Sequence, residues 1–281
     1  MPVFKSSGRS LYTVTQAGID KCLSGDQLYG DDFDADLVRS WHHDEENAYV
    51  ALYASNPNYE YEYTALNVRH GFRHLPTGKF ETVMGFGSAY GDELSPISGR
   101  IGRLVIVESA DSYRQKPALD VPTEWRKATI TGDLDMADTS VDLVTCFGVL
   151  HHIPNVSYIV SELGRVTKPG GYLLLREPVI SMGDWSGPRA GLTPHERGIP
   201  RHILLRLLGE AGFDVERETR CFFSGVSIVI RMSKRPLYDK NSWVVLDQIA
   251  SRLFAFNYRY HATSAWAKVR PTSSFVVARR R

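Results

Sequence analysis

Short apolar runs alternate with amphipathic stretches through the middle of the chain, and this alternation is the first guide to the fold. Each run has the length of a buried strand and is bounded by glycine, proline or polar residues. The predicted strands are 81–86, 103–107, 128–131, 141–147 and 172–178, with two more at 215–223 and 273–279. Strands that alternate with helices imply a largely parallel sheet covered on both faces.

Helical periodicity marks the connections between these strands. The clearest helix is predicted over 154–167, ahead of a glycine pair that would end it. Its apolar stripe consists of Val156, Ile159, Val160, Leu163 and Val166. Further helices are predicted over 36–55, up to about His74, over 200–211 and from 243 to about 256.

The expected fold class is α/β, with a doubly wound, mostly parallel seven-stranded sheet. An N-terminal helical arm and cap would cover 1–77, with 1–35 interpreted as a mobile or lid-like arm because it shows no sustained period. The core would cover 78–223. An inserted helical and aromatic lobe would separate strands six and seven over 224–272, and 273–281 would form the last strand and tail.

Composition narrows the possible partners and the compartment. The 33 basic residues nearly balance the 32 acidic ones, so the net charge of +1 predicts no attraction to nucleic acid or to a membrane. The three cysteines are widely spaced and form no metal or redox pair. Because no apolar run could span a bilayer or act as a signal core, a soluble, cytoplasmic protein is expected.

A closely spaced pair of glycines, Gly85 and Gly87, follows the first strand. Glycines at such a turn let the backbone approach a nucleotide-like ligand, although the same pattern also occurs as ordinary punctuation of α/β folds. Glu108 ends the second strand about twenty residues later. At that distance a Rossmann-like fold places a carboxylate on a ribose diol.

Features farther along occur in a recognisable order. Asp133 follows the third predicted strand, Leu150-His-His152 follows the fourth, and Lys168-Pro-Gly-Gly-Tyr172 precedes the fifth. This succession resembles the class I S-adenosylmethionine (SAM) dependent methyltransferases, and in particular their small-molecule branch. The resemblance covers roughly 78–223 and returns at the last strand, and it implies a Rossmann-like methyltransferase fold with SAM as cofactor.

The resemblance also implies roles for particular residues. Gly85, Phe86 and Gly87 would line the methionine end and the ribose of SAM, and Glu108 would accept hydrogen bonds from the ribose hydroxyls. Around the adenine and the methionine moiety, the implied residues are Asp133 for the amino group, the Leu134 N–H for a ring nitrogen, and Phe147 for an apolar contact.

Two positions depart from the family pattern. Val83 stands where the family usually has an acid, two residues before the first glycine, and Ala89 replaces the third glycine. Val83 puts the usual anchoring of the amino-acid end of SAM in doubt. Ala89 is a smaller change, because alanine still permits close helix packing.

Three histidines are candidates for the general base that deprotonates an acceptor. His151 and His152 follow the fourth strand, and imidazole is a side chain suited to taking a proton from an oxygen acceptor. His195 is the rival because Glu196 stands beside it and would raise its basicity, while Glu177 and Asp184 are fallbacks. The group His42-His-Asp-Glu-Glu46 is interpreted as a solvated helix face, and no metal is predicted.

A long loop over 179–198 would lie above the mouth of the site, because it directly follows strand five. Side chains suited to a polar substrate are Trp185, Arg189, Glu196 and Arg197 in this loop, and Tyr63 ahead of the first strand. Tyr63 can equally serve to pack its helix on the sheet. The lobe at 224–272 would shape the substrate pocket or a subunit contact.

The expected function is SAM-dependent methyl transfer to a small-molecule acceptor, most simply a hydroxyl of a sugar, glycan precursor or natural product. A homo-oligomer is possible. An NAD-dependent oxidoreductase is the alternative, because the same turn and acid can hold NAD, but the chain has no Tyr-x-x-x-Lys pair. A non-catalytic binding module on the same fold is the third hypothesis, for which Val83 is the support.

Overall fold

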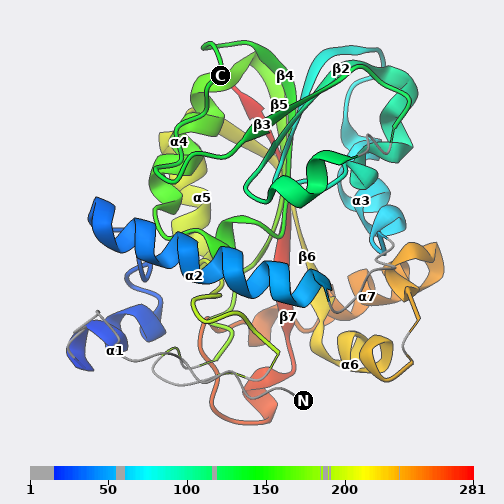
Figure 1. Cartoon of the computed structure of the whole chain (residues 1–281). Coiled ribbons are helices and arrows are strands. Elements are labelled where there is room, and N and C mark those ends of the chain that lie inside the picture. Colours follow the sequence, from blue (N-terminus) through cyan, green and yellow to red (C-terminus); the bar gives the residue numbers. More distant parts are fainter. Residues whose placement is uncertain are drawn as a thin grey trace.

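A computed structural model describes residues 16–54, 61–115, 119–183, 185, 189, 191–233 and 235–281 (Figure 1). Seven strands form one sheet in the order β3-β2-β1-β4-β5-β7-β6. The strands are β1 (Phe80–Phe86), β2 (Ile101–Glu108), β3 (Thr123–Lys127), β4 (Val141–Phe147), β5 (Thr167–Pro178), β6 (Phe213–Phe223) and β7 (Pro271–Arg280).

The first five strands run parallel, and β7 enters antiparallel between β5 and β6. The sheet is built outward from β1 and β4. Strands β2 and β3 follow on the side of β1, and β5 follows on the side of β4. Ligands in such sheets bind beyond the carboxyl ends of the strands at that point. The predicted fold class is confirmed.

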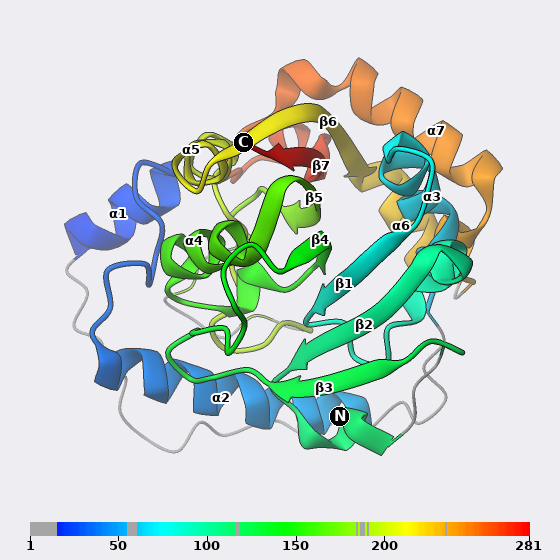
Figure 2. The same cartoon turned by 90° about the horizontal axis from the view of Figure 1, so that it is seen from above.

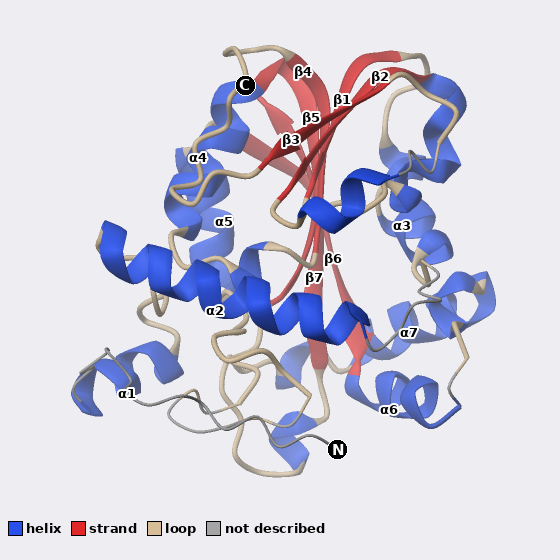
Figure 3. Ribbon diagram, in the orientation of Figure 1, coloured by secondary structure: helices blue, strands red, loops and turns tan. Residues whose placement is uncertain are grey.

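Helices cover both faces of this sheet (Figures 2 and 3). The α-helices are α1 (Gln16–Ser24), α2 (Ala35–Ala54), α3 (Thr64–His70), α4 (Val156–Val166), α5 (Arg201–Glu210), α6 (Ser224–Ser233) and α7 (Asn241–Leu253). The 3₁₀ segments are η1 (Phe72–His74), η2 (Asp92–Arg100), η3 (Asp111–Gln115), η4 (Leu150–His152), η5 (Leu237–Asp239), η6 (Ala255–Asn257) and η7 (Trp266–Lys268). Among the described helices, none is both long and apolar enough to cross a bilayer.

Two apolar clusters form the core, one on each face of the sheet. Helices α4 and α5 supply one cluster together with the sheet, and α3, η2 and α7 contribute to the other. Helix α2 lies apart from both layers and runs past the carboxyl ends of β2 and β3 (Figure 2). A helix in this place can close a site at the end of the sheet.

Three features of the chain differ from the sequence-based prediction. The third strand is Thr123–Lys127, and the predicted strand at 128–131 is wrong. β3 is an edge strand whose residues are half-buried or exposed, so its sequence lacks the apolar run of an inner strand. Helix α1 lies within the region expected to have no period, and α6 was not predicted.

Helices α4 and α5 approach each other closely at a glycine. A Cβ on Gly164 would lie 2.4 Å from the carbonyl oxygen of Ala211, just beyond the end of α5. Gly209, by contrast, stands in α5 with no atom within 4 Å of the place a Cβ would take. The two glycines therefore differ in whether a methyl group fits.

This difference predicts opposite effects of the same substitution. Gly164→Ala should destabilise the protein by roughly 1–3 kcal/mol because the helices must separate. Gly209→Ala should stabilise it by about 0.5–1 kcal/mol because alanine loses less backbone entropy in a helix. Chemical denaturation of the two variants measures both effects, and equal shifts in the same direction would contradict the packing described.

Candidate functional site

A cleft opens at the carboxyl ends of β1, β2 and β4, beneath α2. It contains about 760 Å³ of space between protein atoms, part of it open to solvent. The lining residues are His42, Glu45, Glu46, Phe86, Gly87, Val107, Glu108, Ser109, Ala128, Gly148, Val149, His152, Ile153 and Pro154. The glycine turn, the acid after β2 and one of the paired histidines thus share a single cavity.

The turn after β1 depends on its two glycines. Gly87 has a φ of +64°, and a Cβ at this position would lie 2.5 Å from a methyl group of Val149. A Cβ on Gly85 would lie 2.4 Å from the hydroxyl oxygen of Ser88. The loops after β1 and β4 therefore approach each other only because side chains are absent from the turn.

Glu108 is held in place by the backbone around it. One carboxylate oxygen accepts the Ala89 N–H at 3.0 Å, and the other accepts the Ser109 N–H at 2.8 Å. Ala89 has a left-handed φ of +47°, which glycine would adopt more easily. The carboxylate lines the cleft with further acceptor capacity, as recognition of a diol requires.

A second acid lies buried behind the turn. Glu93, in η2, is 4% exposed, and its Oε1 lies 3.5 Å both from Thr145 Oγ1 and from the place a Cβ on Gly85 would take. Burial raises the pKa of Glu93 to about 7, although hydrogen bonding with Ser88 opposes that rise. Residues 83 and 85 point to one face of β1, so this carboxylate occupies the face on which Val83 lacks one.

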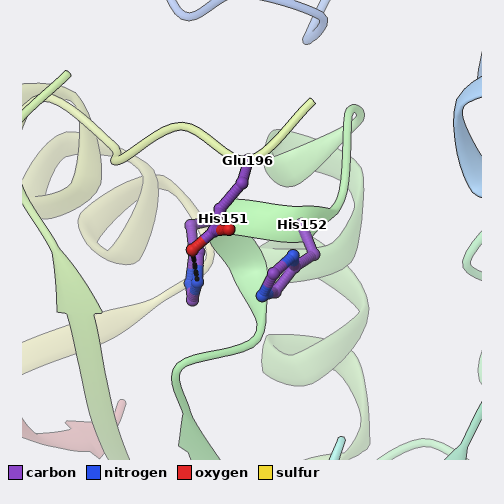
Figure 4. Close-up of side chains that lie close together, drawn as sticks. All are labelled: His151, His152 and Glu196. Atoms are coloured by element: carbon purple, nitrogen blue, oxygen red, sulfur yellow. Dashed lines mark ion pairs between the residues drawn. The ribbon is translucent and has the colours of Figure 1, made fainter. Parts of the chain in front are cut away.

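The loop after β4 is organised around a buried carboxylate. Glu177 is fully buried and accepts the N–H groups of Val149 and Leu150 at 2.8 and 2.9 Å. It also bonds His151 Nδ1 at 2.8 Å, while His151 Nε2 lies 3.5 Å from Glu196 Oε1 (Figure 4). His151 is therefore placed between two carboxylates.

These two carboxylates keep His151 charged. Burial by itself would lower the pKa of His151, but Glu177 and Glu196 outweigh burial and raise it to about 9. Burial would likewise raise the pKa of Glu196, but the two neighbouring histidines lower it to about 2. At neutral pH His151 is thus an imidazolium that donates from Nδ1 to Glu177 and forms an ion pair through Nε2 with Glu196.

His152 has a different partner and faces the cleft. Its Nδ1 lies 2.9 Å from Glu45 Oε2, which also accepts the Thr193 hydroxyl at 2.6 Å. The other oxygen of Glu45 accepts the backbone N–H of His195 at 2.8 Å. Burial would raise the pKa of Glu45, but its hydrogen bonds, first that with His152, lower it overall. Glu45 therefore joins α2 to His152 and to the long loop.

His151, His152 and Glu196 also form the kind of group that can hold a metal ion. One potential ligand atom from each lies within 4.8 Å of the other two. Imidazole and carboxylate ligands suit zinc and related ions. Hydrogen bonds to Glu177 and Glu45 already account for the placement of the two rings, and the absence of a metal stays a prediction.

Comparison with known proteins shows similarity to methyltransferases. A profile of the methyltransferase domain matches residues 86–175. A probable S-adenosylmethionine-dependent methyltransferase of Mycolicibacterium smegmatis is 31% identical over 160 residues, which are 55% of this chain and 59% of that protein. An uncharacterized methyltransferase of Mycobacterium leprae is 30% identical over 129 residues, 46% of this chain and 45% of that protein. Residues 86–175 thus match a methyltransferase domain, and the chain is similar to the class I S-adenosylmethionine-dependent methyltransferases.

The family match does not extend over whole proteins. The chain spans between about half and three fifths of the length of these two curated relatives. Among solved structures, the fold is similar to a chain in the complex of the Trm112 activator and a putative methyltransferase of Haloferax volcanii. That chain has a TM-score of 0.55 at 14% identity, with 84% of this chain and 96% of that one covered. The likeness shows a shared fold.

SAM is the cofactor that this family implies, and the cleft suits it. Phe86, Gly87 and Glu108 of the predicted set line the cleft, with a backbone turn that no side chain blocks and a carboxylate ready for a diol. Gly85 is buried in the same turn. These residues would hold the ribose and the methionine end of the cofactor.

The other predicted cofactor residues lie outside the lining of this cleft. Asp133 is exposed and accepts hydrogen bonds from the hydroxyls of Thr131 and Tyr158. The Leu134 N–H, expected to serve the adenine, donates to Glu162 at 2.9 Å. Phe147 packs against Phe72, Phe275 and Arg176 on the far face of the sheet. Their cofactor roles stay predictions, which the contacts of this conformation do not support.

The predicted substrate residues are held by contacts of their own. Tyr63 lies under the Arg176 guanidinium at 4.5 Å, on the face with α3 and α7. Trp185 stacks on Tyr29 with ring centroids 5.5 Å apart. Arg189 donates to the carbonyl of Glu196, and Arg197 is fully buried and donates to several carbonyls, including that of Tyr29. The two arginines therefore shape the loop from within.

The structure also describes His195, the rival base, and Glu177, one of the two fallbacks. His195 stacks on Trp41 with centroids 4.5 Å apart, and its Nε2 lies 3.0 Å from Asp44. Glu177 is enclosed by the loop after β4. Asp184 lies outside the described residues.

Sequence reasoning missed Glu45 and Glu93. The interpretation of 42–46 as a solvated face is wrong for Glu45, which is only 7% exposed. Val38 and Trp41 of the same helix are buried, so the spacing of Trp41 and Glu45 by four residues could have placed this acid on the inner face. For Glu93 no local pattern indicated burial.

The contacts of His151 predict how its charge responds to a single substitution. Glu177→Gln should lower the pKa of His151 from about 9 and destabilise the protein by roughly 3–5 kcal/mol, because a buried pair loses one charge. The folded-state pKa of His151 is above the unfolded value, so this stabilisation is complete below about pH 6.5 and is lost as pH rises through about 9. NMR titration of the histidine rings and denaturation at several pH values measure both effects.

Asp44→Asn is the matched control, since Asp44 is partly exposed and pairs with His195 instead. It should leave the pKa of His151 unchanged. A His151 pKa that stays near 9 in Glu177→Gln would contradict the assignment.

Proposed function

We propose that the chain transfers the methyl group of SAM to an oxygen of a polar small molecule. The observation that carries this proposal is the shared cleft, in which the glycine turn and Glu108 lie opposite the pair His152 and Glu45. When bound, SAM supplies a methyl group on a sulfonium, ready for displacement by a nucleophile. The protein then has to hold both partners and remove one proton, and positioning can supply roughly 7–11 kcal/mol of the barrier.

His152 is the best-placed base. It lines the cleft, and Glu45 at 2.9 Å from Nδ1 orients its ring and stabilises the imidazolium that forms when a proton arrives. His151 carries a proton at neutral pH and so has no lone pair to offer. An acceptor hydroxyl would therefore donate its proton to His152.

The need for a base favours oxygen as the methylated atom. A hydroxyl is a poor nucleophile until it begins to lose its proton, whereas thiolates and many amines need less assistance. The polar groups that line the cleft, Glu45, Glu46 and His152, suit an acceptor that forms hydrogen bonds. A sugar, a glycan precursor or a hydroxylated natural product meets both requirements.

Glu93 is proposed to supply the acid that position 83 lacks. Val83 belongs to the apolar cluster with Leu104 and Leu143, while the Glu93 carboxylate lies on the same face, behind Gly85 and Ser88. The amino group of the cofactor is a cation. A carboxylate near the turn would attract it, and the cation would in turn favour the ionised form of Glu93.

The cofactor assignment predicts a pattern of binding. Calorimetric titration should show binding of SAM and S-adenosylhomocysteine but not of NADH. Glu108→Ala should weaken binding of both adenosyl ligands roughly 10- to 100-fold, as loss of charge-assisted hydrogen bonds does.

The proposed role of Glu93 predicts a dependence of binding on pH. The pKa of Glu93 is about 7, and only its ionised form attracts the amino group of the ligand. The affinity for S-adenosylhomocysteine should therefore rise as pH increases through 7, and Glu93→Gln should abolish that rise.

Methylthioadenosine is the matched control ligand, since it has the adenosine but no amino group. Its affinity should be insensitive to Glu93→Gln and sensitive to Glu108→Ala. Equal effects of Glu93→Gln on both ligands would contradict the role of Glu93, and binding of NADH instead would revive the oxidoreductase alternative.

The base assignment predicts which histidine matters for turnover. With an acceptor found by screening hydroxylated sugars and phenols, His152→Ala should lower kcat roughly 10²- to 10⁴-fold while SAM affinity is retained. Glu45→Gln should lower kcat less, because it affects only the orientation and charge stabilisation of the ring. A larger loss in His195→Ala than in His152→Ala would move the base to the long loop.

A further inference from the structure

The lobe between β6 and β7 supplies none of the residues that line the cleft. It contains α6, η5, α7, η6 and η7, and its helices α6 and α7 lie on the face opposite α4 and α5 (Figures 1 and 2). The segment after α7 reaches the long loop, where the Tyr258 hydroxyl donates to the carbonyl of Val179 and the Tyr260 hydroxyl to that of Gly198. Helix α7 packs chiefly on β6, and α6 follows β6 directly. What the lobe presents to the outside is therefore independent of the cofactor site.

Helix α7 exposes apolar residues and buries polar ones, the reverse of what is usual for a helix on a water-exposed surface. Its outward stripe is aliphatic: Leu246 is 48%, Ile249 53% and Leu253 65% exposed. Its inward stripe includes Asp247 and Ser251, both fully buried. A solvated amphipathic helix turns its polar residues outward, so this outward stripe is suited to an apolar surrounding.

The aliphatic stripe continues into exposed aromatic residues. Phe256 is 76% exposed and Trp266 is 61% exposed. The ring of Phe254 lies between them, with centroids 6.2 Å from Phe256 and 6.4 Å from Trp266. We call the surface formed by Leu246, Ile249, Leu253, Phe256 and Trp266 the α7 patch. Helix α6 adds an apolar stripe of its own, with Ile228, Val229 and Met232 exposed.

Charge in the lobe is strongly one-sided. Residues 224–270 contain eight Lys and Arg and two acids, which gives a net charge of +6. Because the whole chain has a net charge of +1, the residues outside this segment have a net charge of −5. Of the two acids, Asp247 is buried. Among the residues of the lobe that the structure describes, the exposed cations are Arg231, Arg235, Lys240, Arg252, Arg259 and Lys268. None of these six forms an ion pair with another described residue.

Two alternative occupants fit these observations less well. A second copy would bring the α7 patch against another lobe of charge +6, and like charges oppose that contact. Nucleic acid would match the charge, but it offers no apolar phase for Leu253 or Phe256. An anionic lipid surface provides both an apolar interior for the patch and negative headgroups for the cations beside it.

We propose that this lobe binds the surface of an anionic phospholipid bilayer. The α7 patch enters the boundary between headgroups and acyl chains, with Trp266 at the level where aromatic rings are favoured. Arg252 directly precedes Leu253, and Lys268 stands two residues after Trp266; both contact the headgroups. The near-neutral charge of the whole chain conceals this site, because the remaining residues offset the lobe. Binding is peripheral, with both helices parallel to the surface.

Vesicle co-sedimentation of the full chain tests this proposal. The protein should sediment with vesicles of phosphatidylcholine and phosphatidylserine and remain in the supernatant with phosphatidylcholine alone. Arg252→Glu/Lys268→Glu should weaken binding roughly 10- to 100-fold, and added salt should weaken binding of the unmodified protein. Leu253→Ser/Phe256→Ser should weaken it to a similar degree at constant charge.

The matched control is Lys79→Glu/Arg206→Glu, which makes the same change in net charge at exposed positions outside the lobe. This variant should bind vesicles like the unmodified protein. S-adenosylhomocysteine affinity checks that each variant is folded, and it also separates this proposal from the proposed function, because vesicle binding needs no cofactor.

Three results would overturn the proposal. The first is no sedimentation with anionic vesicles, and the second is equal loss in the control variant. The third is a concentration-dependent dimer that Leu253→Ser/Phe256→Ser abolishes in the absence of vesicle binding, which would assign the α7 patch to a second copy.

Discussion

The buried carboxylate of Glu177 is the interaction on which the site depends. It stands near the end of β5, where the sheet excludes water, and accepts backbone N–H groups from the loop after β4 as well as the ring of His151. A buried anion is costly unless hydrogen bonds and a counter-charge surround it. The loop is therefore shaped by the acid. Its shape fixes Val149 against the glycine turn and turns His152 toward the cleft.

From this point, carboxylates join the loop to two more distant segments. Glu196 brings the long loop to His151, and Glu45 brings α2 to His152 and to the backbone of His195. Trp41 strengthens the same contact by stacking on His195 and donating its indole N–H to the carbonyl of His152. The helix over the cleft is thus attached through the residues that carry the proposed chemistry.

The lobe after β6 obeys a different constraint. Its inner side satisfies buried polar groups: Asp247 accepts the N–H groups of Phe222 and Phe223 and the hydroxyl of Tyr238. Asp247 faces the interior, while the aliphatic residues of α7 lie on the outside, beside cations that form no ion pair with any residue in the described part of the chain. The lobe supplies none of the residues that line the cleft, and its exposed residues suit a surface that is both apolar and negative.

The sequence by itself determined the class of fold, the similarity to methyltransferases and the position of the glycine turn at the cleft. Each of these features depends on a short segment of sequence. The segments are apolar runs with the length of strands, Gly85 and Gly87 after the first run, and Glu108 at the end of the second. Backbone propensity and periodicity act over a few residues, so they can be read locally. The half-exposed β3 has no such pattern, which is why its position was predicted wrongly.

Only the tertiary structure decided which side chains meet. Glu45 is 107 residues from its partner His152, and Glu177 is 26 residues from His151. Whether a carboxylate is buried depends on which other segments pack over it. The outward face of α7 is exposed because no described segment packs over it. Charge shows the same limit, since the net +1 of the chain is a sum that holds no information on where the charges lie. Contacts between distant segments follow from packing, which local sequence does not encode.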